Sequence, residues 1–419
     1  MTAYLAGRAP DTGGRPWYEL STHHRWLAVE AERLLDFGKN SAVPGGFGWL
    51  DDGGMVMADR GVQSWITTRM TYAFSLAALW GRPGAADLAR HGLEALQTTL
   101  HDDVHGGWFS IVSAGEVLDD RKKAYEHAFV VLAASAATIA GLSGAREVLT
   151  EALEVIDRHF WSRTDGLAAD LYDRSFTVLD SYRGANANMH LTEAYLAAAD
   201  ATGDEVYTER ALSIAEQLIN GHAQEHDWRL PEHYTDSWQP VLEHHRDQPR
   251  HPYQPFGVTP GHLLEWSRLL ICLHTSLTVA PAWLLNHAVQ LFERGVGDGW
   301  DGNLGGLRYT VDFAGKTSVA DRLHWVAAEG IGAAGTLSSL FGDPGYERWY
   351  RQLWDWSETH LIDRDRGSWL HELDEAGRPS QLTWPGKPDV YHALQATLVA
   401  RLPAVSSFAR GIADGQLRA

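Results

Sequence analysis

Two kinds of helical segment alternate along the chain, and they differ in how their apolar positions are distributed. In residues 19–37 the apolar side chains, among them Trp26, Leu27, Leu34 and Leu35, form one stripe with helical spacing. The other kind is apolar around most of its circumference, which is typical of a helix buried on most sides. Striped segments are 19–37, 85–100, 145–160, 204–220, 281–294 and 346–361, and apolar ones are 64–80, 124–142, 187–201, 259–277, 325–341 and 389–401.

A loop rich in glycine and aromatic residues precedes each apolar segment. The first, 44–51, contains Gly45-Gly46-Phe47-Gly48-Trp49, and the second, 103–109, contains Gly106-Gly107-Trp108-Phe109. Turn glycines beside strand-favouring residues indicate short β-hairpins. Comparable loops begin or lie at 165–167, 222–258, 305–309 and 366–371, and the loop 222–258 is the longest and the richest in His, Trp and Pro.

A unit of striped helix, loop and apolar helix therefore occurs six times, with a period of roughly 60 residues. Helices joined by short breaks pack as antiparallel neighbours. Six such pairs form either an open solenoid or a closed ring, and the first and last copies lack the polar capping face that a solenoid needs. We predict an all-α fold, a closed (α/α)6 barrel with short β-hairpins at one mouth. It is one domain of residues 16–405 between tails at 1–15 and 406–419.

Composition narrows the class of protein. Of the 419 residues 44% are hydrophobic, and no apolar run is long enough to cross a bilayer. A net charge of −19 argues against nucleic acid or an anionic membrane as partner. Cys272 is the only cysteine, which fits a reducing compartment, and the polar start of the chain lacks a signal-peptide core. We expect a soluble cytoplasmic protein, a monomer or homodimer.

Polar and aromatic residues gather in the first turns of the apolar helices. The clearest start is Thr259-Pro260, since threonine suits the N-cap and proline the first helical position. His262 and Glu265 follow, three apart and on one face of that turn. The corresponding positions of the other five helices are Trp65, Arg69, Lys122, Tyr125, His127, Asn186, His190, Trp325, Glu329, Lys387, Asp389, Tyr391 and His392. Packing alone would scatter such groups in depth, so we predict a functional site at the mouth.

These residue types suit proton transfer on a sugar. Histidine exchanges protons near neutral pH, and a tryptophan face can stack on the C–H face of a sugar ring. A carboxylate lies three residues from each of two histidines, Glu265 from His262 and Asp389 from His392. Each pair either orients the imidazole or is a plain contact within one helix. Candidate substrate contacts are Arg69, Tyr125, Asn186, His190, Trp325, Glu329 and Asp389.

Metal and nucleotide motifs are missing from the sequence. There is no His-Glu-x-x-His, no cysteine pair and no acidic loop with cation-binding spacing. The Gly-Gly pairs precede aromatic residues and do not open helices, unlike phosphate-binding loops. We therefore predict a site without metal or cofactor.

Five stretches carry a family resemblance. They are Thr67-Thr68-Arg69-Met70-Thr71, Lys122-Lys123-Ala124-Tyr125-Glu126-His127-Ala128-Phe129, Asn186-Ala187-Asn188-Met189-His190, Thr259-Pro260-Gly261-His262-Leu263-Leu264-Glu265-Trp266 and Lys387-Pro388-Asp389-Val390-Tyr391-His392. With them the chain resembles the N-acylglucosamine 2-epimerase superfamily, in particular its branch of aldose–ketose isomerases. The resemblance implies that His262 and His392 do acid–base work without cofactor or metal. It also implies that Arg69, Asn186, His190 and Glu265 hold substrate hydroxyls or orient a histidine.

The function expected from this resemblance is interconversion of D-mannose and D-fructose through a cis-enediol, with D-lyxose as a further substrate. Two activities of the same superfamily remain open, 2-epimerisation of D-mannose and isomerisation of sulfoquinovose. For the latter, the positions expected to carry a sulfonate-binding arginine hold Pro252 and Gln254, although Arg246 and Arg250 are close in sequence. Two functions from other classes also remain open. An (α/α)6 glycoside hydrolase would use two carboxyl groups from among Glu265, Glu329 and Asp389 for catalysis. A sugar-binding protein would use none of them for catalysis.

Overall fold

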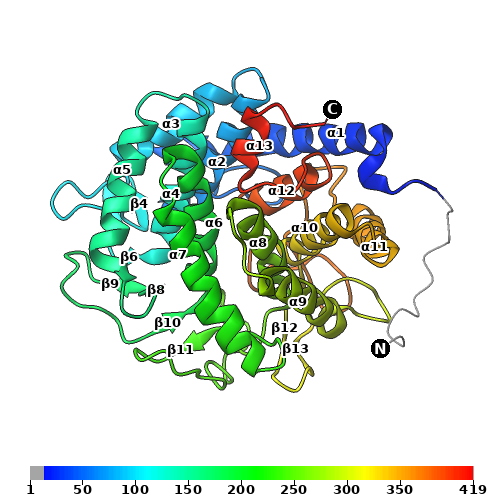
Figure 1. The fold of residues 1–419 in the computed structure, drawn as a ribbon. Helices are drawn as coiled ribbons and strands as arrows, with labels where there is room; N and C mark the ends of the chain where they lie inside the picture. The colour runs from blue at the N-terminus through cyan, green and yellow to red at the C-terminus, as the bar shows by residue number, and fades with distance from the viewer. Residues whose placement is uncertain (1–13, 419) are drawn as a thin grey trace.

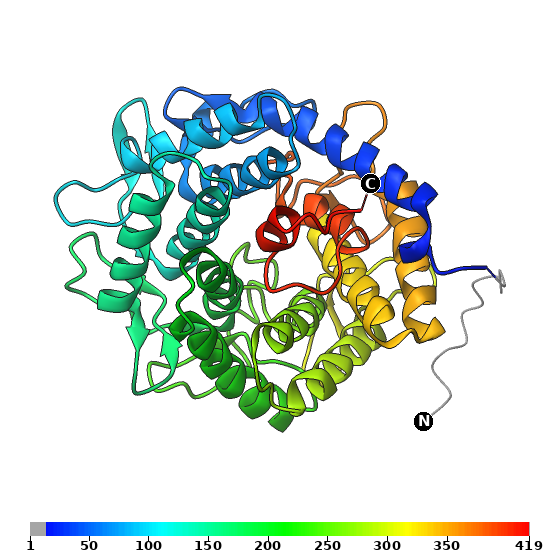
Figure 2. The same cartoon turned by 45° about the horizontal axis from the view of Figure 1, so that its top comes forward.

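The helices form two concentric layers in the computed structural model, which describes residues 14–418 (Figures 1 and 2). The inner layer consists of α2 (Ser64–Leu79), α4 (Ala124–Ile139), α6 (Ala185–Thr202), α8 (Pro260–Ser276), α10 (His324–Phe341) and α12 (Tyr391–Val399). The outer layer consists of α1 (Ser21–Gly38), α3 (Ala85–Gln97), α5 (Ala145–Val155), α7 (Val206–Ala215), α9 (Trp283–Gly299) and α11 (Pro344–His360). Each predicted helix is present.

The ring is closed, as predicted. Each inner helix packs on the next, and α12 packs on both α2 and α1. The first outer helix thus covers the last inner one, so the chain's beginning and end join the same part of the ring; Figure 2 shows the blue helix beside the orange and red ones. This pairing leaves no inner helix exposed at an end of the array, which explains why no polar capping face is present.

Inner helices pack closely because their side chains are small or hydrogen-bond internally. Ala133, Ala134 and Ala137 of α4 are fully buried. The hydroxyls of Thr71 and Ser75 in α2 donate to carbonyl oxygens four residues earlier, at 2.6 and 2.7 Å. Burial of these hydroxyls therefore leaves no lost hydrogen bond.

Helix ends differ from the predicted ones by a few residues. The segments 145–160 and 204–220 leave the α-helical path early and continue as wider π-helical turns, Ile156–Phe160 and Glu216–Ala223. Thr259 is the N-cap of α8 and Pro260 is in its first turn, as predicted, but the Thr259 hydroxyl makes no capping bond. The predicted start of this helix is confirmed, but the predicted capping role of the Thr259 side chain is wrong.

Short antiparallel strands form a collar around the mouth. They are β1 (Ala42–Val43), β2 (Gly46–Phe47), β3 (Val62–Gln63), β4 (Ile111–Ser113), β5 (Glu116–Asp119), β6 (Lys122–Lys123), β7 (Trp161–Ser162), β8 (Leu167–Ala168), β9 (Leu171–Tyr172), β10 (Arg183–Gly184), β11 (His233–Tyr234), β12 (Thr310–Val311), β13 (Thr317–Val319), β14 (Arg322–Leu323) and β15 (Glu372–Leu373). The predicted local hairpins are present as β1–β2, β7–β8 and single bridges such as His101 with Trp108.

Further strand pairs connect neighbouring repeats. Each segment that leads into an inner helix pairs with the loop of the following repeat, in β3–β4, β6–β9, β10–β11 and β14–β15. A bridge between Val258 and Val311 does the same before α8. The Lys387 N–H donates to the Leu50 carbonyl and joins the last repeat to the first. The collar thereby holds the six helix N-termini in a fixed arrangement.

The C-terminal segment 406–419, expected to be a tail, contains one more helix, α13 (Phe408–Ala413). It packs on α2, α4 and α6 at the end of the barrel opposite the mouth and lies near the centre of the ring in Figure 2. Phe408 and Ile412 are buried there, so the segment helps to cover the apolar interior. The expected N-terminal tail falls almost wholly outside the described residues. Among the described helices, none is long and apolar enough to cross a membrane.

Candidate active site

The mouth of the barrel contains a pocket built from the first turns of the inner helices. The space between its walls is about 740 Å³, a figure that includes open solvent at the mouth. Nine of the ten predicted site residues line it, namely Arg69, Tyr125, Asn186, His190, His262, Glu265, Trp325, Asp389 and His392. Glu329 is not part of the lining. The predicted constellation is therefore brought together in space.

The pocket wall also contains residues that the sequence analysis did not single out. Trp384 stacks on Trp49 with ring centroids 6.1 Å apart, and Tyr253 meets Trp384 edge-on at 5.3 Å. On another side His324 and His371 stack at 3.6 Å. These residues lie in loops or one position before a predicted helix, where no periodic pattern marks them. Only the richness of the loops in aromatic residues and histidine could have pointed to them.

His262 is oriented by a glutamate, but by Glu232 and not by the predicted Glu265. Its Nδ1 lies 2.8 Å from Glu232 Oε1, and the Glu232 side chain is buried. Glu232 immediately precedes β11, which pairs with the strand leading into α6. The collar therefore brings this carboxylate to α8 from 30 residues earlier in the chain. The side chains of a helix point outward from its axis, so a carboxylate on a neighbouring loop can reach Nδ1 of the imidazole.

His392 shows the same arrangement with Glu329. Its Nδ1 lies 2.7 Å from Glu329 Oε1, and both side chains are buried. The suggested partner Asp389 instead forms an ion pair with Arg69 at 3.2 Å and accepts the Tyr391 N–H. In each histidine the carboxyl group accepts a hydrogen bond from the Nδ1–H, so Nε2 is left as the nitrogen that can accept or deliver a proton.

Trp325 lies between the two histidines. Its ring centroid is 5.1 Å from that of His262 and 5.8 Å from that of His392. Gly261 permits this position, because a Cβ there would collide with the indole. One aromatic ring thus contacts both imidazoles, and all three side chains line the pocket, so a small substrate can contact both histidines.

Arg69 is a fixed positive charge at the edge of the pocket. Besides Asp389, it donates to the Tyr125 hydroxyl at 2.8 Å. Its buried Nε has no hydrogen-bond partner among the described residues. Burial, followed by the charge of Arg69, holds the pKa of His392 well below its usual range. His392 is therefore neutral near pH 7, as a base must be.

Glu265 lies apart from both histidine pairs. Burial raises its pKa well above the usual range, and the carboxylates of Glu329 and Glu193 raise it further. Neither carboxylate oxygen has a hydrogen-bond partner in the described part of the chain. The closest counterpart is His190, whose Nδ1 is 3.7 Å from Glu265 Oε1. Two trios of buried side chains have potential metal ligands within 4.8 Å of one another, His190–Glu193–Glu265 and Glu265–Glu329–His392.

Comparison with known proteins identifies the family of the chain. Residues 45–396 match the model of the N-acylglucosamine 2-epimerase (GlcNAc 2-epimerase) family. The chain is 48% identical to a D-mannose isomerase of Thermobifida fusca, over 95% of this chain and 98% of the relative. It is 44% identical to a D-mannose isomerase of Pseudomonas cannabina pv. alisalensis, over 95% and 97%. A crystal structure of a D-mannose isomerase superposes with a TM-score of 0.85 at 30% identity, covering 94% of this chain and 99% of that one.

The matches over nearly the whole chain and the shared barrel define the class of the protein, an enzyme that acts on a sugar. The chain belongs to the N-acylglucosamine 2-epimerase family and is a sugar isomerase.

Proposed function

We propose that this enzyme interconverts D-mannose and D-fructose, and accepts D-lyxose as a smaller substrate. The observation that carries the proposal is the pair of histidines His262 and His392, each held through Nδ1 by its own glutamate and both lining one pocket. Two independently oriented imidazoles suit a reaction that moves one proton between carbons and another between oxygens. The D-mannose isomerase relatives support the choice of sugar.

The proposed reaction starts when the sugar ring opens. His392 removes the proton from C2 and the electron pair forms the C1–C2 double bond of a cis-enediol. His262 supplies a proton to O1 and takes one from O2, and the C2 proton returns to C1 to give the ketose. Arg69 stabilises negative charge on the enediol oxygens, and its preorganised position avoids reorganisation during the step.

The pocket favours a neutral sugar over a sulfonate. Arg69 is the only arginine in its lining. Arg250 is ion-paired with Asp321 at 2.6 Å and Arg246 with Glu243, so both nearby guanidiniums are engaged outside the pocket. A sulfonate would need an arginine in addition to the one that faces the reacting oxygens, and we therefore propose isomerisation of an uncharged aldose.

A glycoside hydrolase is disfavoured by the same geometry. It needs two carboxyl groups facing one glycosidic bond. Of the three candidates, Glu329 is hydrogen-bonded to His392 and does not line the pocket. Asp389 lines the pocket but is paired with Arg69. This leaves Glu265 as the candidate that lines the pocket without an arginine or lysine partner. A 2-epimerase would need both histidines to act at carbon from opposite faces.

The decisive experiment follows D-mannose in D₂O by NMR. Fructose as the first product supports transfer along one face, whereas glucose deuterated at C2 and appearing first would show an epimerase. His392→Asn should lower turnover about 10²–10⁴-fold while thermal melting stays close to wild type. Turnover like that of wild type would refute the assignment of His392.

The reaction is proposed to need no metal and no cofactor, because a side chain fills every role. Activity should therefore survive dialysis against a strong chelator. Loss of activity that returns with added Mn²⁺ or Zn²⁺ would contradict this mechanism. The single buried cysteine, Cys272, fits our proposal of a cytoplasmic enzyme, and we expect a monomer or homodimer in sedimentation analysis.

A further inference from the structure

Three buried side chains beneath the pocket are arranged as metal ligands. His190 and Glu193 lie three residues apart on α6, and Glu265 faces them from the adjacent helix α8. Their exposed fractions are only 4%, 6% and 1%. A Glu-x-x-His pair on one helix with a carboxylate from its neighbour is a known way to bind metals inside helical bundles, and here the pair runs in the order His-x-x-Glu.

The distances suit a small divalent ion. His190 Nδ1 and Glu265 Oε1 are 3.7 Å apart, and all three ligand atoms lie within 4.8 Å of one another. Ligand atoms about 2.0–2.2 Å from a tetrahedral Zn²⁺ are about 3.4 Å from each other.

Two of the three ligands have unpartnered atoms. His190 Nδ1 and both Glu265 oxygens have no hydrogen-bond partner within residues 14–418. Buried polar atoms without partners are costly and rare in native proteins.

The third ligand, Glu193, is hydrogen-bonded. Its carboxylate accepts the Tyr391 hydroxyl and, at 2.9 Å, the Gln395 amide N–H. A carboxylate oxygen has two lone pairs, so these bonds can persist while Glu193 binds an ion. In the other trio, His392 Nδ1 donates its only proton to Glu329, so an ion there would have to break a 2.7 Å bond. The first trio is therefore the better site.

Cavities on both sides give the site room. His190 and Glu265 line the sugar pocket, while Glu193 and Arg268 line a smaller cavity beneath α13. An ion can therefore approach the site from the mouth. One imidazole and two carboxylates suit Zn²⁺, Co²⁺ or Mn²⁺, whereas Ca²⁺ prefers six to eight oxygen ligands.

We propose that His190, Glu193 and Glu265 bind one divalent transition-metal ion, which inhibits the enzyme by competing with the sugar. Competition follows because the ion would occupy His190 and Glu265, two residues of the sugar pocket. Only this inhibitory part rests on the proposed function; metal binding itself does not.

The test titrates chelator-treated full-length protein with Co²⁺, followed by its visible absorption, and with Zn²⁺, followed by calorimetry. We expect one ion per chain. Glu193→Gln and Glu265→Gln should weaken Co²⁺ affinity more than about 100-fold, beyond the 10–100-fold typical of outer-shell changes. Glu329→Gln is the matched control, since it makes the same change in the other trio, and its affinity should stay close to wild type. Circular dichroism verifies folding, and His190→Gln replaces any variant that does not fold.

Several outcomes would overturn the proposal. They are the absence of Co²⁺ binding, equal binding by all variants, and loss of binding in Glu329→Gln but not in Glu193→Gln. In the activity assay Zn²⁺ should raise the apparent KM for D-mannose, leave kcat unchanged and be reversed by chelator; a fall in kcat alone would refute competition. If the protein had no isomerase activity, the proposed function would fail while the binding result would still stand or fall by itself.

Discussion

The two histidines of the site show how a single hydrogen bond selects the chemistry of a residue. An imidazole can present either nitrogen to a substrate, and the carboxylate on Nδ1 decides that it is Nε2. Both carboxylates are buried, at 4% exposure for Glu232 and 2% for Glu329, so solvent screens their effect little. The orientation of each ring is therefore part of the fold and does not depend on the substrate.

Replacing Glu232 by glutamine should test this at His262. The amide keeps the size of the side chain, and its oxygen can still accept a hydrogen bond from the Nδ1–H, but it cannot stabilise the imidazolium that forms when His262 takes a proton. We expect kcat to fall by up to about 10²-fold, with KM and thermal melting nearly unchanged. The control is Glu225→Gln in the same part of the chain, where the side chain is exposed. A fall in melting temperature that accounts for the lost activity would show a merely structural role.

Sequence alone predicted the residues of the pocket better than their partners. Position in the first turn of an inner helix is a periodic property, and nine of the ten predicted residues line the pocket. The partner of His262 lies in the irregular loop before β11, and the partner of His392 is on the neighbouring helix α10. Contacts between helices depend on the ring geometry, which local spacing does not contain. Glu329 was therefore chosen as a substrate contact although it positions His392.

The loops between the helices also determine how the inner helices are aligned. The glycine and aromatic pattern predicted the local hairpins, but it contained no sign that the segments before the inner helices pair with the next repeat. Such two-residue strands lack a periodic signal because they are too short to alternate. They are nevertheless what aligns the helix N-termini.

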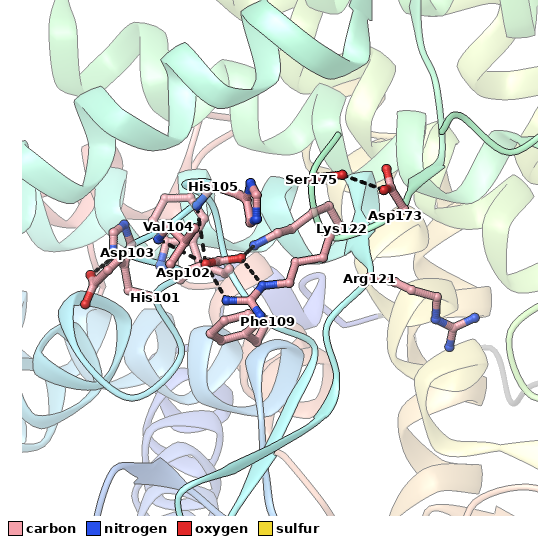
Figure 3. A network of polar contacts seen from close by, with 12 residues as sticks. His101, Asp102, Asp103, Val104, His105, Phe109, Arg121, Lys122, Asp173 and Ser175 are labelled. Atoms are coloured by element: carbon pink, nitrogen blue, oxygen red, sulfur yellow. Dashed lines mark hydrogen bonds and ion pairs between the residues drawn. The ribbon is translucent and has the colours of Figure 1, made fainter. Parts of the chain in front are cut away.

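A buried ion pair joins the loop that begins at Asp102 to strand β6 of the collar (Figure 3). Lys122, fully buried, donates to Asp102 Oδ2 at 3.0 Å, and Asp102 Oδ1 accepts the N–H groups of Val104 and His105. The same arrangement recurs with Asp301 and Arg322 and with Asp363 and Lys387. Lys122 and Lys387, which sequence spacing placed among the mouth residues, are thus structural.

Asp102→Asn should be strongly destabilising. It leaves the Lys122 ammonium buried beside an uncharged amide, and breaking a buried pair costs about 3–5 kcal/mol. Asp103→Asn, at the next position with its side chain 89% exposed, should change stability by no more than about 0.5 kcal/mol. Urea unfolding of both variants at pH 7 makes the comparison. Equal small losses would contradict this expectation, because Asp102 also pairs with Arg174 and its replacement leaves two cations without their shared carboxylate.

The whole molecule is a closed ring, and closure explains where its polar groups lie. Periodicity and the absence of capping faces sufficed to predict six pairs of helices in a ring. The cover formed by α13 was not predicted, because a helix of six residues has too few turns for a periodic pattern. α13 covers the far end, and strand pairs between repeats hold the collar together at the mouth. Many titratable groups are therefore buried in the interior, so the stability of the barrel depends on pH.

The contribution of a buried histidine to this pH dependence of stability can be measured at His127. The residue is fully buried, its Nδ1 donates to the Lys123 carbonyl at 2.7 Å and its Nε2 accepts the Trp108 N–H at 3.3 Å. Burial lowers the pKa of His127 to about 3. Since the pKa in the unfolded chain is about 6.5, both states are neutral above that value. As the pH falls toward 3, the unfolded chain binds the proton first and folding loses free energy.

His127→Gln should remove this loss, because glutamine offers a donor and an acceptor but does not titrate. Between pH 7 and pH 5 the wild type should lose about 2 kcal/mol more unfolding free energy than the variant, whatever offset the substitution causes at pH 7. Urea unfolding at the two pH values measures the difference. His105→Gln on the exposed turn of the same loop controls for the loss of a histidine as such. Parallel pH dependence in wild type and His127→Gln would show that the ring of His127 takes up its proton in the folded barrel, at the expense of the Trp108 hydrogen bond.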